Sequence, residues 1–141
     1  MPPNHDLGLT HVALMVTKPE ASIAFYEKYA AMRVVHRRID DATQRTVVWL
    51  SDRTRPFVIV LIETNQVDAP LRPAAHLGVG CRSREQVERL CGEAADEGAL
   101  LSGPTDSGYP VGYWAFLTDP DGNTLEISYG QEIALTVAQA G

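Results

Sequence analysis

The stretch FLTDPDGNTLEISYG, residues 116–130, reads as a strand, a tight turn and a second strand. The DPDG sequence at 119–122 combines the fixed φ of proline with a permissive glycine, which favours a sharp reversal of the chain. The second strand alternates between apolar and polar side chains, and Glu126 stands in its polar row. A carboxylate in the middle of such a strand predicts a partner or a ligand on the same face of the sheet.

The order strand, helix and three β-rich segments occurs twice in the chain. LTHVALMV (9–16) is typical of a strand, and TKPE (17–20) predicts a capping box with its threonine as the N-cap. AHLGVGC (75–81) and SREQ (83–86) repeat this pattern, and Gly98 is the expected stop of the second helix. Both helices carry an apolar stripe, formed by Phe25, Tyr29 and Met32 in the first and by Val87, Leu90, Cys91, Ala94 and Ala95 in the second.

Three β-rich segments follow each predicted helix. They are RVVHRRI, RTVVWLS and FVIVLIET in the first half, and ALLSG, GYWAFLT and NTLEISYG in the second. The sequence therefore predicts an α+β fold, with one domain over residues 1–141 built from two βαβββ modules at about 7–64 and 74–130. Between the modules we expect a linker at 65–73, and after them a C-terminal tail at 131–141.

Composition and charge narrow the class of protein. The chain has 141 residues, 45% of them hydrophobic, which is enough for one domain with its own core. A formal net charge of −6 disfavours nucleic acid and anionic membrane surfaces as partners. The sequence has no apolar run of membrane length and no signal-peptide pattern, so we expect a cytoplasmic location. Cys81 and Cys91 match no metal or redox spacing and are interpreted as core residues.

One helix covers only one face of each predicted sheet, so the other face is left for a ligand. His76 shares this second face with Gly78 and Gly80, and His11 holds the place in the first module that His76 holds in the second. Together with Glu126 they give two imidazoles and one carboxylate, a set that suits a divalent transition metal and leaves positions open for substrate or water. A single strand histidine is more often a hydrogen-bonded structural residue, so both interpretations stand at this point.

Three segments, in this order, resemble the vicinal oxygen chelate superfamily, the glyoxalase, bleomycin-resistance and dioxygenase group: LTHVALMVTKPEASIAFYEKY (9–29), AAHLGVGCRSREQVERL (74–90) and GYWAFLTDPDGNTLEISYG (112–130). The resemblance covers nearly the whole chain. It implies paired βαβββ modules whose curled sheets enclose a cavity for a small-molecule substrate and a divalent metal, which would be Fe, Mn, Ni or Zn. It also implies His11, His76 and Glu126 as the ligands of that metal, and a homodimer.

The chain departs from glyoxalase I at the fourth ligand, which the resemblance places on the last strand of the first module. Superposing WLSDRTRPFVIVLI on FLTDPDGNTLEISY sets Ile59 or Val60 opposite Glu126. The only acid nearby is Glu63, three or four positions later. We interpret Glu63 as a solvated residue at the strand end, with its role as a fourth ligand left open. Glyoxalase I activity is therefore disfavoured.

The chain also departs from the extradiol dioxygenases, which use two His and one Glu as ligands. The resemblance places a Tyr three residues before the turn Asp and a His earlier, but Phe116 takes the Tyr position and no His follows His76. Tyr109 or Tyr113 supplies the missing hydroxyl only if SGPTDSGYPVGYW folds over the cavity, and Tyr113 is the candidate substrate-binding residue. We therefore expect poor cleavage of simple catechols.

Two classes of function remain. The first is a dioxygenase-, isomerase- or lyase-like enzyme acting on a small oxygen-rich compound, with the metal as a Lewis acid. The second is a binding protein of the bleomycin-resistance type, which sequesters a toxic molecule without turnover. Binding members of the family typically lack metal ligands, so the complete His, His and Glu set favours the enzyme. The fold does not select the substrate or the reaction.

Overall fold

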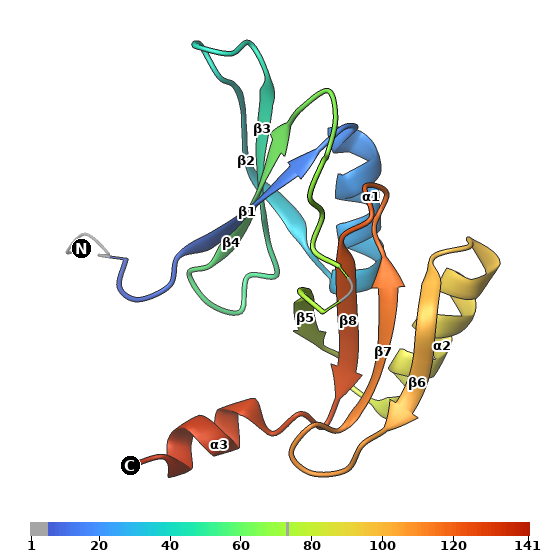
Figure 1. Cartoon of the computed structure of the whole chain (residues 1–141). Helices are drawn as coiled ribbons and strands as arrows, with labels where there is room; N and C mark the ends of the chain where they lie inside the picture. Colours follow the sequence, from blue (N-terminus) through green and yellow to red (C-terminus); the bar gives the residue numbers. More distant parts are fainter. Residues whose placement is uncertain (1–5, 73) are drawn as a thin grey trace. The chain divides into compact units, whose positions relative to one another are not determined.

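The computed structural model describes residues 6–72 and 74–141 and is drawn in Figure 1. The chain divides into two compact units, Met1–Ala69 and Pro70–Gly141, and this boundary falls within the segment 65–73. Each unit has a four-stranded sheet with a helix packed on it. Among the described residues, no helix is both long and apolar enough to cross a membrane.

The first unit holds one strand before its helix and three after it. These elements are β1 (His11–Val16), α1 (Pro19–Ala30), β2 (Arg33–Ile39), β3 (Thr46–Ser51) and β4 (Val58–Glu63). The strands lie in the order β1-β4-β3-β2, with β1 parallel to β4 and the other neighbours antiparallel. The first and last strands of the unit are therefore side by side.

The second unit repeats this topology. Its elements are β5 (Leu77–Gly80), α2 (Arg84–Asp96), β6 (Leu100–Asp106), β7 (Tyr113–Thr118) and β8 (Thr124–Tyr129), followed by α3 (Ile133–Gln139). The strand order is β5-β8-β7-β6, again with the first and last strands parallel. Figure 1 shows α2, in yellow, running alongside β6 of its own sheet.

The predicted α+β fold with two βαβββ modules is confirmed. Most strand ends differ from the predicted ones by one or two residues, as is usual for element boundaries. The sequence predicts no element in the tail 131–141, where the structure has α3. This helix buries none of its seven residues, and its large apolar residues, Ile133, Leu135 and Val137, recur every second position, so no helical stripe marks it in the sequence.

Each long helix buries one face on its own sheet. The buried residues of α1 include Phe25, Tyr26 and Tyr29, and Met32 is buried just beyond its end. Four of the five stripe residues predicted for α2 are buried, but Ala95 is exposed, so the stripe is one residue narrower than predicted. The strand residues beneath the helices are Val48, Leu50, Ile59 and Leu61 in the first unit and Ala115, Leu117, Leu125 and Ile127 in the second.

Both cysteines behave as core residues of the second unit. Cys91 is buried in α2, and Cys81 is half-buried just after β5. Burial raises the pKa of both thiols above the ordinary value. The prediction that they are structural fits this environment, because a raised pKa keeps a thiol protonated and unreactive.

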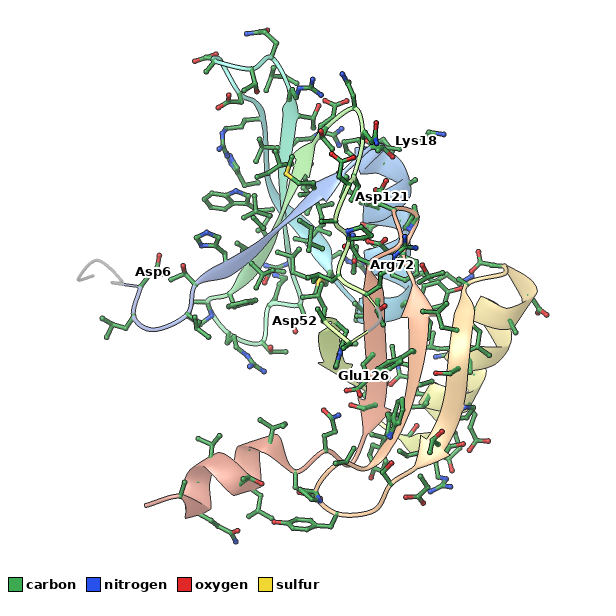
Figure 2. The ribbon with its side chains drawn as sticks, in the orientation of Figure 1. Asp6, Lys18, Asp52, Arg72, Asp121 and Glu126 are labelled. Carbon is green, nitrogen blue, oxygen red and sulfur yellow. The ribbon has the colours of Figure 1, made fainter. Side chains whose placement is uncertain are left out.

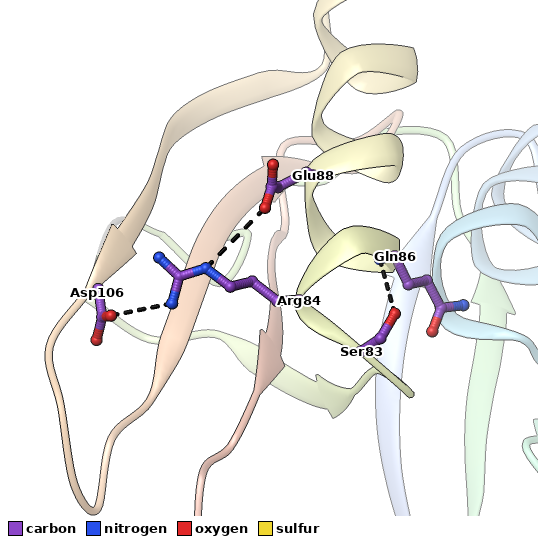
Figure 3. Close-up of polar contacts among 5 residues, drawn as sticks. All are labelled: Ser83, Arg84, Gln86, Glu88 and Asp106. Carbon is purple, nitrogen blue, oxygen red and sulfur yellow. Dashed lines mark hydrogen bonds and ion pairs between the residues drawn. The ribbon is translucent and has the colours of Figure 1, made fainter.

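The start of α2 is capped as the sequence predicts. Ser83 is the N-cap, and its Oγ accepts a hydrogen bond of 3.0 Å from the Gln86 N–H, drawn in Figure 3. Gln86 Oε1 in turn accepts a bond of 2.7 Å from the Arg82 N–H. The side chains thus satisfy two backbone donors at the helix start.

The predicted cap of α1 is wrong. Its N-cap is Lys18 rather than Thr17, and no side-chain cap bond is present there. The reason is Pro19, which occupies the first helical position, where a residue without an N–H fits best. The proline therefore sets the helix start one residue later than the threonine would.

The turn at 119–123 is built as predicted and also holds the chain that precedes β5. Gly122 has a φ of +92°, and Asp119 accepts hydrogen bonds from the Asp121 and Asn123 backbone N–H groups. Asn123 Oδ1 accepts from the Leu71 N–H at 2.9 Å. Figure 2 labels Asp121 in this turn and Arg72, which follows Leu71 and lies near Gly122 of the turn.

Candidate functional site

Glu126 lies in the middle of β8, on the face of the second sheet that points away from α2 (Figure 2). Its strand neighbours Leu125 and Ile127 are fully buried, so alternation turns Glu126 to the other side. Only 9% of Glu126 is exposed, and its Oε2 accepts a hydrogen bond of 2.7 Å from Gln131 Nε2. A Cβ on Gly78, its partner on β5, would lie 3.6 Å from the same oxygen. The glycine therefore keeps space clear beside the carboxylate.

His76 lies just before β5, on the same face as Glu126. Its ring centroid is 5.1 Å from that of Phe116, and Phe116 is the residue directly opposite Glu126 in the β7–β8 ladder. His76 Nδ1 lies 2.8 Å from the Ala74 carbonyl oxygen. A carbonyl only accepts, so in this bond Nδ1 carries the proton, and neutral His76 presents the Nε2 lone pair.

His11 is the first residue of β1, in the first unit. It is exposed, and its Nδ1 lies 2.9 Å from Thr10 Oγ1. The buried residues of the same strand, Leu14 and Val16, point toward the helix side, and His11 has the opposite parity. It therefore lies on the face of the first sheet that α1 does not cover.

This open face of the first sheet has a concavity of about 540 Å³. Residues that line it include His11, Val60, Trp49, Arg38 and Arg55. The volume falls within the range of natural ligand sites, about 300–1,000 Å³. The concavity combines an imidazole, an indole ring, aliphatic side chains and two guanidinium groups in the first unit alone.

Strand pairing settles which residue of the first module corresponds to Glu126. In the second unit, Glu126 pairs with the residue two places after His76. In the first unit, the residue two places after His11 pairs with Val60. Val60 is therefore the counterpart of Glu126, so the first module has an apolar residue at the place of the fourth glyoxalase ligand.

Glu63 has a contact of its own at the end of β4. Its Oε1 accepts a hydrogen bond of 2.9 Å from the Thr46 N–H at the start of β3. Glu63 is an odd number of residues from Val60 on the same strand, so the two side chains point to opposite faces. The carboxylate thus closes the end of the β3–β4 ladder rather than joining the face that carries His11.

Tyr113, the predicted substrate-binding residue, faces α2 rather than the side of Glu126. The Arg84 guanidinium carbon lies 3.8 Å from the centroid of its ring. Arg84 is also paired with Asp106 at 3.0 Å, as Figure 3 shows, and this hydrogen bond raises the pKa of Arg84. The aromatic residues on the face of Glu126 are Trp114 and Phe116, whose ring centroids are 4.9 Å apart.

The segment at 102–114 forms a hairpin. The Ser107 N–H donates to the Gly112 carbonyl at 2.9 Å, and Trp114 Nε1 donates to Ser107 Oγ at the same distance. Tyr109, at its tip, is 68% exposed. Each of these contacts stays within the second unit and fixes the β6–β7 connection.

The three predicted metal ligands are divided between the two units. His11 belongs to the first, and His76 and Glu126 belong to the second. Among the described residues, no three His, Cys, Asp or Glu side chains are gathered as a metal site. What the second unit brings to one face is a pair, His76 and Glu126, with Phe116 opposite Glu126 in the β7–β8 ladder and its ring beside that of His76.

Comparison with known proteins places the chain in a family. Residues 8–127 match the model of the Glyoxalase/Bleomycin resistance protein/Dioxygenase superfamily. The chain belongs to this superfamily. It is 39% identical over 128 residues to the uncharacterized protein PA2024 of Pseudomonas aeruginosa, a match that covers 89% of this chain and 90% of that protein.

Solved structures of this glyoxalase superfamily share the fold. The trypanothione-dependent glyoxalase I of Leishmania major matches with a TM-score of 0.68 and 21% identity, over 96% of this chain and 94% of that one. A mutant of the fosfomycin resistance protein FosX of Listeria monocytogenes, in complex with Mn(II) and dihydroxypropylphosphonic acid, matches with a TM-score of 0.72 and 15% identity. That match covers 94% of this chain and 99% of the FosX chain.

Sequence reasoning missed several residues around these positions. Gln131 lies in the tail after β8, and nothing in its spacing marks it as a donor to Glu126. Arg38, Trp49 and Arg55 lie on three different segments that only the strand pairing brings to one concavity. RTVVWLS gives no clear signal for Trp49, because Val47, Val48, Trp49 and Leu50 form an unbroken apolar run and do not alternate.

Proposed function

We propose that this glyoxalase-superfamily protein is a metal-dependent enzyme acting on a small oxygen-rich compound, with one divalent transition metal held by His11, His76 and Glu126. The observation that carries the proposal is their shared placement: each lies on the helix-free face of its own sheet, and the two histidines occupy equivalent places. When bound, Fe, Mn, Ni or Zn supplies Lewis-acid chemistry to two neighbouring oxygens of the substrate.

The surroundings of His76 fit a metal ligand. A metal-bound imidazole usually donates its second N–H to a carbonyl or carboxylate, which fixes the tautomer and the ring orientation. The contact from Nδ1 to the Ala74 carbonyl does this for His76. The stacking of its ring on Phe116 adds a second restraint on the same side chain.

The surroundings of Glu126 fit as well. The carboxylate is almost fully buried, and its hydrogen-bond partner Gln131 is a neutral amide. Among the described residues, Glu126 takes part in none of the ion pairs, which involve Arg37, Arg84 and Arg89. A buried carboxylate without a cation is costly, and a divalent metal would supply the missing positive charge.

A small-molecule resistance protein is the second candidate function. The FosX neighbour is itself named a resistance protein and was crystallised with Mn(II), so a metal on this fold does not separate resistance from other roles. Turnover does. We favour the enzyme because the ligand set, once loaded, supplies chemistry that simple sequestration does not need.

The test of the metal site is the metal content of single variants. After chelation and reloading with Mn, Ni, Zn or Fe(II), we expect about one metal per chain in the wild type. In His11→Ala, His76→Ala and Glu126→Ala we expect the metal affinity to fall by about 100-fold or more relative to the wild type, because the two remaining donors compete poorly with water. Glu63→Ala is the matched control and should keep the wild-type content, since its carboxylate bonds to Thr46. Full metal content in any of the three ligand variants would refute the assignment.

We further propose that the protein is a homodimer, and a mixing experiment tells whether a site uses one chain or two. His11→Ala and Glu126→Ala chains are co-expressed with different tags, and the mixed dimer is purified. If each site combines His11 of one chain with Glu126 of the other, one of the two sites in the mixed dimer is intact and half the metal returns. If each site lies within one chain, both sites are damaged and no metal is recovered. A monomer in light scattering would contradict the dimer.

A further inference from the structure

We propose that the concavity on the open face of the first sheet is an oxyanion site, in which Arg38 and Arg55 bind a carboxylate or phosphate-type group of a small ligand. Both side chains line the concavity, together with His11 and Trp49. A planar guanidinium matches such groups with two parallel N–H donors, and charged hydrogen bonds of this kind are the strong ones.

The two arginines are available for a ligand. Elsewhere in the described chain Arg37, Arg84 and Arg89 are each paired with a carboxylate, whereas Arg38 and Arg55 enter no ion pair there. Arg38 Nη1 lies 3.1 Å from the Nε2 of the neutral partner His36, which orients the guanidinium without neutralising it. Asp6 also lines the concavity, so its walls carry two positive charges against one negative charge.

The charge distribution supports the same conclusion. Residues 1–69 hold eight Lys and Arg against eight Asp and Glu, while residues 70–141 hold four against ten. The whole net charge of −6 therefore resides in the second unit. The first unit thus has no net charge of its own, and Arg38 and Arg55 against Asp6 give its concavity a positive local potential that favours an anionic ligand.

Trp49 and its neighbours indicate what the rest of the ligand would be. Trp49 is 38% exposed and lines the same concavity as Val58 and Val60. Its ring centroid lies 4.7 Å from that of His36. This wall is flat and apolar beside the two cations. The site thus suits a small organic acid with an apolar or aromatic body, rather than a free inorganic ion.

The binding site stands on the geometry of the first unit alone, but its use as the substrate site rests on the proposed function. His11 lines the same concavity as the two arginines. An anionic group held by Arg38 and Arg55 would place the remainder of the molecule along the face that carries this histidine. The arginines are then specificity-determining residues, and the anion need not touch a metal.

The test uses chelator-treated, metal-free protein with Trp114→Phe as the background, so that Trp49 is the only indole. Benzoate, phenylphosphonate and inorganic phosphate are titrated at low salt, with benzamide as the neutral analogue of benzoate. We expect both aromatic anions to change Trp49 fluorescence, and the anion with the lower Kd has the preferred head group. Benzamide should bind at least about tenfold more weakly than benzoate. Binding should weaken as salt is added.

Single variants then assign the anion to its partners. Arg38→Gln and Arg55→Gln should each weaken binding of the preferred anion about tenfold or more. Arg38→Lys should weaken it less than Arg38→Gln, because lysine keeps the charge but loses the two parallel N–H donors of the guanidinium. Arg53→Gln is the matched control: it removes the same charge from the same loop, at a residue that does not line the concavity. It should change the affinity less than about twofold.

Four outcomes would overturn the oxyanion site. The first three are the absence of anion binding, equal affinity for benzoate and benzamide, and equal effects of the Arg53 and Arg55 variants. Anion binding that appears only after metal is added would also do so, since the metal and not the arginines would then hold the anion. Normal metal content without anion binding rejects this site alone. Anion binding by a wild-type protein that takes up no metal on reloading rejects only the proposed metal site.

Discussion

The two units have the same topology but carry different chemistry on their open faces. Where the second unit has Glu126, almost buried and bonded to Gln131, the first has Val60. The first unit has Arg38 and Arg55 beside Trp49, and among the described residues neither arginine enters an ion pair. The second unit carries the acidic excess of the chain, with ten Asp and Glu against four Lys and Arg. The comparison teaches that the helix-covered faces of the two units share an apolar core that supports the same fold, while the open faces carry different side-chain chemistry.

The connections before the last strand of each unit also differ. In the second unit Asp119 and Asn123 are 4% and 3% exposed and hold the turn by bonds to backbone and to each other. In the first unit the longer loop 52–57 is exposed over 52–56, and Asp52 accepts hydrogen bonds from the N–H and the hydroxyl of Thr54. The second connection is thus a buried polar network, and the first is a solvated loop.

The largest effect is expected from removing that network. Asn123→Ala leaves the Leu71 N–H and one oxygen of Asp119 without their partner, because Asn123 bonds to both at 2.9 Å. We expect a loss of about 2–4 kcal/mol in the free energy of unfolding, since each unsatisfied buried group costs about 1–3 kcal/mol. Urea unfolding followed by circular dichroism measures it.

The matched variant in the first unit is Thr54→Ala, which removes the equivalent side chain from the exposed loop. Its cost should be below about 1 kcal/mol, because water replaces the lost bonds. Equal losses for Asn123→Ala and Thr54→Ala would show that burial does not distinguish the two connections.

The helix starts give the next largest effect. Ser83→Ala removes the bond to the Gln86 N–H and should destabilise the protein by about 1 kcal/mol. Lys18 has an extended conformation with φ −134° and ψ 90°, so an N-cap side chain fits there without strain. Lys18→Asp should therefore stabilise by about 0.5–1 kcal/mol, through a new cap and a favourable charge at the helix start.

Thermal unfolding at matched pH measures both helix-start variants. The opposite signs are the informative feature, since one variant removes a cap that exists and the other installs a missing one. Lys18→Ala is the control for the charge and should change stability little. A destabilising Lys18→Asp would mean that the start of α1 does not accept a side-chain cap.

Much of the fold follows from the sequence because it depends on local patterns. Alternation marks β8, helical spacing marks α2, and the DPDG sequence marks the turn before β8, and each of these is confirmed. The cap of α1 was mispredicted because two local signals, threonine and proline, compete within three residues. Helix α3 buries none of its residues, so no packed face requires an apolar stripe in its sequence.

The candidate site is only partly predictable, because it depends on strand register. The placement of Val60 opposite the position of Glu126 needs hydrogen-bond pairing between strands far apart in the sequence, and parity alone left Ile59 equally possible. The same register sets Tyr113 beside Tyr129 on the helix side, away from Glu126. The metal-ligand assignment itself stays a prediction.

The smallest effect concerns two acids at equivalent hairpin corners, Asp40 after β2 and Asp106 at the end of β6. Hydrogen bonds from Thr43, first from its hydroxyl and then from its N–H, lower the pKa of Asp40. The pKa of Asp106 is lowered by the Gly108 N–H and then by the side chain of Arg84. Asp106 is exposed and Asp40 is half-buried at the surface, so each contributes little.

A carboxyl whose folded pKa is lowered contributes stability above its unfolded pKa, about 3.9, and loses it as the pH falls through the folded value. Asp40→Asn and Asp106→Asn should therefore lower the urea midpoint slightly at pH 7 and lose this difference below about pH 3. Salt should separate them: the Asp106 effect should shrink at high ionic strength because Arg84 is an ionic partner. The Asp40 effect should shrink less, because its largest causes are the bonds from neutral Thr43 and the charge of Arg38 is a smaller one. If both variants respond equally to salt, the ion pair between Arg84 and Asp106 adds no measurable stability to that of the Gly108 N–H bond. The two hairpin corners would then not differ in their electrostatics.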